Sequence, residues 1–151
     1  MNSYQTCALE GASPVETTIA LYDGIIRFMY RAIEAVERGN PEVRRLAVKR
    51  AMDIVMHLQA TLKMDVGGKP AESLADFYAA MFALMLQGSQ ANSKKKFEHV
   101  IVNVQNVREA WRQVARDPDA VSTRATFDAI ASHRGAVIIE AADMSRSRWT
   151  V

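Results

Sequence analysis

The chain has 151 residues, of which 49% are hydrophobic and 24% charged, a balance typical of one folded domain rather than of disorder. Its formal net charge of +2 is too small to indicate nucleic-acid binding, and Cys7 is its only cysteine, which favours a reducing compartment. The longest apolar stretch has ten residues, whereas a membrane span needs about twenty, and no secretory signal opens the chain. We therefore expect a cytoplasmic protein that does not insert into membranes.

The first predicted helix covers residues 14–38. Ser13 can cap it, Pro14 suits the first helical position, and Glu16 can complete a capping box. Gly24 lies well inside this helix, where glycine costs about 1 kcal/mol relative to alanine. We expect Gly24 to remove a side chain where another bundle helix or a partner comes close. The apolar stripe is Ile19, Tyr22, Ile26, Met29, Ile33 and Val36.

The second predicted helix covers residues 41–65, after Gly39-Asn40-Pro41 ends the first, and Gly67-Gly68 predicts a turn before a third helix over 70–87. Methionines gather on these two helices and suit an adaptable groove; they are Met52, Met56, Met64, Met81 and Met85. No charged residue lies between Phe77 and Asn92. The third helix is therefore either covered by another element or exposes an apolar patch to a partner.

The fourth predicted helix starts at Asn92 or Ser93 and ends at Arg116, and a weaker helical pattern follows over 120–144. Short turns between helices favour antiparallel neighbours. We predict an all-α, antiparallel up-down-up-down four-helix bundle in a single domain, 1–151. Its core is 14–116, with an N-terminal arm and an extra C-terminal helical segment in the extension 117–151. The stripe of the fourth helix is Phe97, Val100, Val104, Val107, Trp111 and Val114.

Candidate catalytic and metal-binding groups are few. Asp53 and His57 lie four residues apart on one helix face, which is half of a metal site, and no Glu-x-x-His occurs. Arg50 and His57 have the Arg-x6-His spacing seen in HEPN-type ribonucleases, a spacing that is frequent by chance. We expect no metal, no cofactor and no enzymatic activity, and a HEPN-type ribonuclease is the less favoured alternative.

Several short stretches, taken in order, resemble the flagellar secretion chaperone FliS family over residues 4–116. They are Tyr4, Ser13-Pro14, Leu21-Tyr22-Asp23-Gly24, Gly67-Gly68, Phe77-Tyr78 and Ala110-Trp111. The resemblance implies a bundle in the bacterial cytosol that holds the disordered C-terminal segment of flagellin as helices on its surface. It also implies that the protein blocks premature filament assembly and delivers flagellin to a flagellar export gate component. A co-chaperone is a further candidate partner.

The contact surface is expected to use apolar residues of the second to fourth helices, near Tyr4 and Tyr22. Sequence alone does not separate groove from core among them. The predicted partner-binding residues are Tyr4, Tyr22, Leu58, Leu62, Tyr78, Met81, Met85, Val100, Val104 and Val107. A rival interpretation is a bundle whose apolar patch forms a homodimer. A separate hypothesis is that the extension folds back over the third helix as a mimic of the client, through Phe127, Ile130, Val137 and Ile138.

Overall fold

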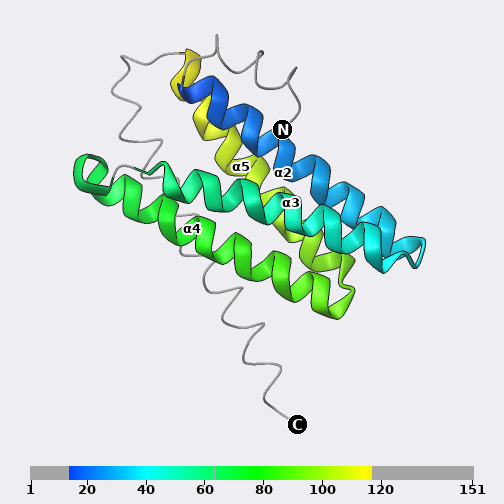
Figure 1. The fold of residues 1–151 in the computed structure, drawn as a ribbon. Helices are drawn as coiled ribbons and strands as arrows, with labels where there is room; N and C mark the ends of the chain where they lie inside the picture. Colours follow the sequence, from blue (N-terminus) through cyan, green and yellow to red (C-terminus); the bar gives the residue numbers. More distant parts are fainter. Residues whose placement is uncertain (1–13, 63, 117–151) are drawn as a thin grey trace.

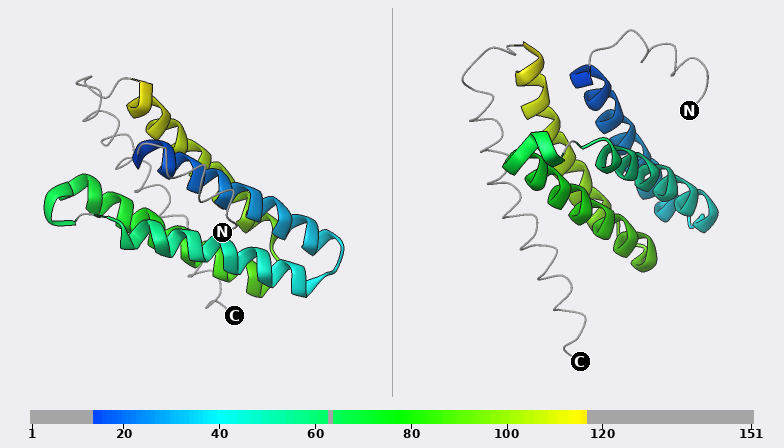
Figure 2. Two further views of the ribbon diagram at one scale, coloured as in Figure 1. Left: turned by 45° about the horizontal axis from the view of Figure 1, so that its top comes forward. Right: turned by 60° about the vertical axis from the view of Figure 1, so that its left-hand side comes forward.

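The computed structural model describes residues 14–62 and 64–116, and for residues 64–70 it describes the backbone alone. These residues form four helices and no strand: α2 (Pro14–Glu37), α3 (Pro41–Ala60), α4 (Met64–Ala91) and α5 (Lys94–Arg116). Each helix packs antiparallel on the next, and α5 returns to α2, so α2 and α4 lie diagonally across the bundle (Figures 1 and 2). The predicted all-α four-helix bundle is confirmed. The N-terminal arm and the C-terminal segment lie outside the described residues.

The turn between α2 and α3 uses the residues that the sequence marks for it. Gly39 adopts a φ of 65°, which glycine tolerates without strain, and the Asn40 N–H then donates to the Ala35 carbonyl at 2.9 Å. The Asn40 side-chain oxygen accepts from the Val43 N–H at 3.2 Å and caps α3. The predicted helix end at Gly39-Asn40-Pro41 is therefore confirmed.

The turn between α4 and α5 has the same geometry without a glycine at its left-handed position. Asn92 takes that position with a φ of 50°, and the Ser93 N–H donates to the Gly88 carbonyl at 2.9 Å. The Ser93 hydroxyl accepts from the Lys96 N–H at 3.3 Å and satisfies a donor in the first turn of α5. Helix α5 consequently begins at Lys94, close to the predicted start.

The connection between α3 and α4 differs from the prediction. Helix α3 ends at Ala60, and α4 already begins at Met64, so Gly67-Gly68 lies inside a helix and the predicted glycine turn is wrong. The reversal needs no glycine at the end of α3, because Thr61 caps that helix with a φ of −88°. The Thr61 hydroxyl also donates to the Leu58 carbonyl at 3.0 Å. The chain thus turns before it reaches the glycine pair.

The core lies along the axis of the bundle and takes side chains from every helix. Residues of the predicted stripes fill it, which explains why each described helix is amphipathic. The largest fully buried side chains are Tyr22, Ile25, Met29, Val55, Phe77, Tyr78, Met81, Leu84, Met85, Phe97, Val100 and Val104. Because these residues already occupy the interior, a partner must find its apolar contacts on the outward faces.

Candidate partner-binding surface

Three aromatic side chains form a hydrogen-bonded chain through the core. The Trp111 indole N–H on α5 donates to the Tyr22 hydroxyl at 3.1 Å, and the Tyr22 and Tyr78 hydroxyl oxygens lie 2.7 Å apart. The two tyrosine rings meet edge to face, with centroids 6.3 Å apart. Each polar tip thereby finds a partner inside the apolar core, where an unpaired hydroxyl is costly. The predicted stripes include Tyr22 and Trp111, but the meeting of these two residues with Tyr78 depends on the tertiary arrangement.

Burial keeps the Tyr22 and Tyr78 hydroxyls protonated. Loss of solvation raises the pKa of Tyr22 well above its usual value, and the neighbouring Tyr78 adds to that effect. Loss of solvation likewise raises the pKa of Tyr78 to about 12, although its hydrogen bond with Tyr22 acts in the opposite direction. The pair therefore remains a neutral structural element at physiological pH.

An ion pair braces α2 against α5 beside this aromatic chain. Asp23, the neighbour of Tyr22, lies 2.6 Å from an Arg108 guanidinium nitrogen. The Arg108 side chain is only 20% exposed, and its buried Nε has no hydrogen-bond partner among the described residues. Arg108 is therefore a partly desolvated cation that depends on Asp23 for compensation. The Asp23 side chain itself remains 42% exposed.

Gly24 faces α3, not the solvent. A Cβ atom built on Gly24 would lie 3.1 Å from the terminal Cδ1 of Ile54 on α3. This agrees with the expectation that Gly24 makes room for a neighbouring bundle helix. The close neighbour is, however, the end of a side chain and not a backbone, so the contact leaves some room for adjustment.

The structure buries most of the predicted partner-binding residues within the bundle itself. The buried residues are Tyr22, Leu58, Tyr78, Met81, Met85, Val100, Val104 and Val107, each at most 3% exposed. Leu62 is half-buried against the core near the end of α3, and Tyr4 lies outside the described residues. A helix that docks on the closed bundle therefore touches their neighbours. Direct contact by the buried residues would require helix separation and stays a prediction.

Exposed apolar side chains form a strip along the outer seam between α3 and α4. Met56 is 57% exposed and Leu86 is 42% exposed. Met52 and Phe82 are half-buried against the core, while Ala79 is exposed. We define the α3–α4 strip as Met52, Met56, Ala79, Phe82 and Leu86. The uncharged run on α4 and the methionines of α3 are the signals in the sequence that point to this surface.

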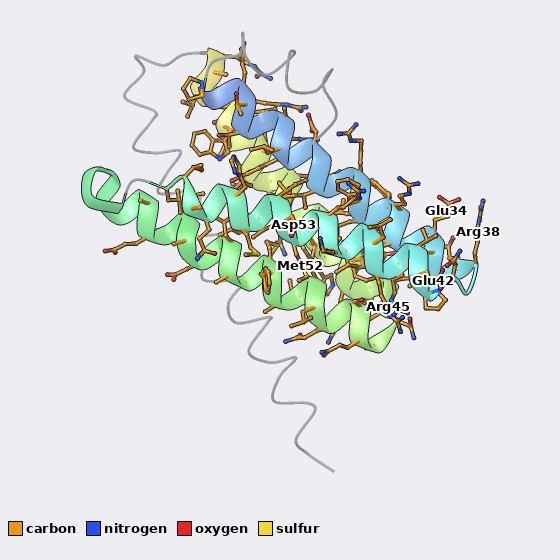
Figure 3. All side chains as sticks on the ribbon, in the orientation of Figure 1. Glu34, Arg38, Glu42, Arg45, Met52 and Asp53 are labelled. Atoms are coloured by element: carbon orange, nitrogen blue, oxygen red, sulfur yellow. The ribbon has the colours of Figure 1, made fainter. Side chains whose placement is uncertain are left out.

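The register of the two helices shows that the strip is continuous. Arg44 on α3 donates to the Ser89 hydroxyl of α4 at 3.3 Å. Met52 lies eight residues after Arg44, and Phe82 lies seven before Ser89, so each occupies the corresponding side of its helix. In antiparallel helices these steps bring Met52 level with Phe82. Figure 3 shows Met52 and Arg45 along the edge of α3 that faces α4.

Charged residues lie at both ends of the strip. Arg45 and Lys49 are exposed on α3 at the level of Leu86. The Lys49 Nζ lies 3.3 Å from Oδ2 of Asp53 on the same helix. Glu72 and Asp76 are exposed on α4 at the opposite end, before Ala79. The strip is therefore an apolar surface that is basic at one end and acidic at the other.

A smaller apolar area lies across the bundle, where α2 packs on α5. Tyr30 is 55% exposed and Val102 is 53% exposed. Asp23 and Arg108 form an ion pair on one side of this area, and Glu37 and Lys94 form another, 3.6 Å long, on the other side. Val102 provides a matched reference for Met56, because the two side chains are similarly exposed on opposite faces.

The residues of the alternative interpretations lie on the outside of α3. Arg50, Asp53 and His57 are all exposed. Within residues 14–62 and 64–116, no group of three or more His, Cys, Asp or Glu side chains is placed to hold a metal ion. None of the four helices is long and apolar enough to cross a bilayer.

Comparison with known proteins agrees with the resemblance seen in the sequence. A family model described as "Flagellar protein FliS" matches residues 1–118. The chain is 32% identical over 113 residues to a "Flagellar secretion chaperone FliS" of Campylobacter jejuni, covering 75% of this chain and 88% of that protein. It is 30% identical over 109 residues to the protein of that name from Salmonella typhimurium, covering 72% and 81%. The Bacillus subtilis protein of that name is 27% identical over 111 residues, covering 74% and 82%.

Proposed function

Because the chain belongs to the FliS family of flagellar secretion chaperones, we propose that it binds the C-terminal segment of flagellin along the α3–α4 strip. The client segment would fold into an amphipathic helix on this surface and bury its apolar face there. Bound in this way, the client could not assemble prematurely. The complex would then pass to a flagellar export gate component, with a co-chaperone as a candidate third partner.

The observation that carries the proposal is the uncharged outward side of α4 beside two methionines of α3. Soluble helices ordinarily carry charged residues on an outward face, yet α4 has none between Phe77 and Asn92. Methionine side chains adapt to irregular partners, and Met56 offers one that is 57% exposed. Such a surface suits an apolar helix that gains its structure on binding.

Titration of the full chain with a flagellin C-terminal peptide tests the proposal. Calorimetry should give binding at micromolar affinity or tighter, and circular dichroism should show a gain of helix beyond the sum of the separate spectra. We expect Met56→Glu to weaken binding at least tenfold, because it places a charge within the apolar strip. Leu86→Glu should act in the same direction.

Val102→Glu provides the matched control. Val102 is 53% exposed on the α2–α5 side, so this variant changes exposure, charge and size in a similar way outside the strip. It should bind the peptide like the wild type. Equal affinities for Met56→Glu and the wild type, in proteins of equal thermal stability, would contradict the assignment of the strip.

The same samples separate the rival interpretations. A dimer that forms with increasing concentration, is lost in Met56→Glu and binds no peptide would assign the strip to a second copy of the chain. Cleavage of RNA that is lost in His57→Ala would favour the ribonuclease. Either result, combined with no peptide binding, would overturn the chaperone proposal.

A further inference from the structure

Helices α4 and α5 meet along a line of small side chains that contains one buried amide (Figure 2). On α4, Ser73 is 4% exposed and Ala80 is 9% exposed, while Asn103 of α5 is also 9% exposed. Ala83 and Ala110 are half-buried on the same sides of the two helices. We define the α4–α5 junction as Ser73, Ala80, Ala83, Asn103 and Ala110. It lies on the flank of α4 that is turned away from α3.

One hydrogen bond fixes which sides of α4 and α5 face each other. The Lys96 Nζ donates to the Gln87 Oε1 at 3.4 Å. Asn103 lies seven residues after Lys96, and Ala80 lies seven before Gln87, so each occupies nearly the same side of its helix as the bonded residue. Because the two helices are antiparallel, these steps bring Asn103 level with Ala80. The buried amide therefore lies across from a side chain that has no polar group.

The Asn103 amide has no hydrogen-bond partner among the side chains and backbone of residues 14–62 and 64–116. An asparagine side chain carries two N–H donors and one carbonyl acceptor. Burial removes water as a partner, and an amide that stays unpaired destabilises the folded protein. Asparagine at this position is therefore unfavourable for the bundle alone, and it suits a partner that brings a polar group to the α4–α5 junction.

We propose that the α4–α5 junction is a second contact site for the flagellin segment, and that the Asn103 amide forms a hydrogen bond with a polar group of this client. The inference rests on the proposed function, because it extends the same client beyond the α3–α4 strip. Ala79 and Leu86 of the strip and Ala80 and Ala83 of the junction all lie within the uncharged run of α4. A segment that leaves the strip thus crosses α4 without covering a charged side chain.

The chemistry of the α4–α5 junction suits a polypeptide rather than a purely apolar ligand. Alanine and serine side chains are short, so the backbone of a client can approach α4 closely and pack against it. A client with a polar group opposite Asn103 satisfies the amide. A client without one leaves the amide unpaired, and this difference discriminates between the two. The junction would therefore add specificity to the affinity that the apolar strip supplies.

The variant Asn103→Leu in the full-length chain tests this role, because leucine is similar in size and has no polar group. We expect its thermal midpoint to stay unchanged or rise, since the unpaired amide is removed. Its affinity for the flagellin C-terminal peptide, measured by calorimetry, should fall at least about fivefold. Gln105→Leu is the matched control. Gln105 is half-buried three residues before Arg108, on the α2 side of the same helix, so this variant should bind like the wild type.

The variant Asn103→Ala covers the case in which leucine disturbs folding, and it should weaken peptide binding as well. Equal affinities of the wild type and of both folded variants would overturn the role of Asn103. A purely structural amide would give the reverse pattern, in which Asn103→Leu loses thermal stability and keeps its affinity, and that result would also overturn the inference. Failure of the wild type to bind the peptide would instead overturn the proposed function.

Nuclear magnetic resonance reports on the hydrogen bond directly. The side-chain NH₂ signals of Asn103 are identified in a nitrogen–proton correlation spectrum by their absence in Asn103→Leu. Adding the peptide should shift these signals, whereas those of Asn40, which caps α3 at a distant turn, should stay in place. Shifts around Met56 without any shift at Asn103 would confine the client to the α3–α4 strip and overturn the inference.

Discussion

The hydroxyl oxygens of Tyr22 and Tyr78 lie 2.7 Å apart and join α2 to α4, the two helices that lie diagonally across the bundle. Trp111 of α5 donates a second hydrogen bond to the Tyr22 hydroxyl. One hydroxyl thus connects three of the four helices. Polar bonds of this kind select one arrangement of helices among several that would bury similar apolar surface.

Replacing Tyr22 with phenylalanine tests how much these hydrogen bonds contribute to the stability of the protein. Tyr22→Phe keeps the ring but removes the hydroxyl that bonds to the Trp111 N–H and the Tyr78 hydroxyl, so we expect a loss of about 1–3 kcal/mol in the free energy of unfolding. Chemical denaturation measures it. Tyr30→Phe, at an exposed tyrosine, should change stability by less than about 0.5 kcal/mol. Equal small changes in both variants would show that the hydrogen bonds of the Tyr22 hydroxyl contribute little to the free energy of unfolding.

The two buried tyrosines also predict a loss of stability at alkaline pH. Their pKa values are raised in the folded protein, that of Tyr78 to about 12, so the unfolded chain releases these protons first. Their contribution is fully present below about pH 10 and is lost as the pH rises toward the folded pKa. For Tyr78 alone the loss at about pH 11 is about 1.4 kcal/mol, and Tyr22 acts in the same direction.

Urea denaturation at several pH values between neutral and strongly alkaline conditions measures this dependence. The double variant Tyr22→Phe/Tyr78→Phe is the control, because it keeps every other titrating group. Its stability should decline less steeply above about pH 10 than that of the wild type. Parallel declines in the two proteins would contradict the assignment to these hydroxyls.

Gly24 and Ile54 should be coupled in their effects on stability. Gly24→Ala gains about 1 kcal/mol of helix propensity, but its Cβ would lie 3.1 Å from Ile54 Cδ1. In the wild-type background the two effects oppose each other. In an Ile54→Val background, which removes Cδ1, Gly24→Ala should be more favourable by at least about 0.5 kcal/mol. A double-mutant cycle by chemical denaturation measures this difference, and simple additivity would exclude the contact.

Asp23 and Arg108 should respond unequally to substitution. Asp23→Asn leaves the Arg108 guanidinium, which is 20% exposed, without its compensating charge, so we expect a loss of about 1–2 kcal/mol. Arg108→Met keeps an apolar stem and removes the buried Nε that lacks a partner, so its cost should be smaller. Thermal denaturation of both single variants compares them. A greater cost for Arg108→Met would contradict this account.

Two signals in the sequence point to the candidate surface, although none of the ten predicted partner-binding residues belongs to the α3–α4 strip. The uncharged run of α4 and the methionines of α3 indicate where apolar side chains gather, and both contribute to the α3–α4 strip. Individual positions were harder to predict, because an apolar residue on a wide stripe can face either the core or the seam. Met85 is fully buried, whereas Leu86, the next residue, is 42% exposed. Successive residues of a helix point in different directions around its axis, so a step of one residue separates a core position from a position on the seam.

By itself, the sequence determined the helical class, the capped turn at Gly39-Asn40 and the amphipathic stripes, because these follow from backbone preferences and from local spacing. Tertiary structure alone decided which stripes meet. It brought Tyr22, Tyr78 and Trp111 together, paired Asp23 with Arg108, and placed Gly24 against Ile54. It also started α4 before the glycine pair. The physical reason is that contacts between distant segments depend on register and on helix rotation, which local propensities do not determine.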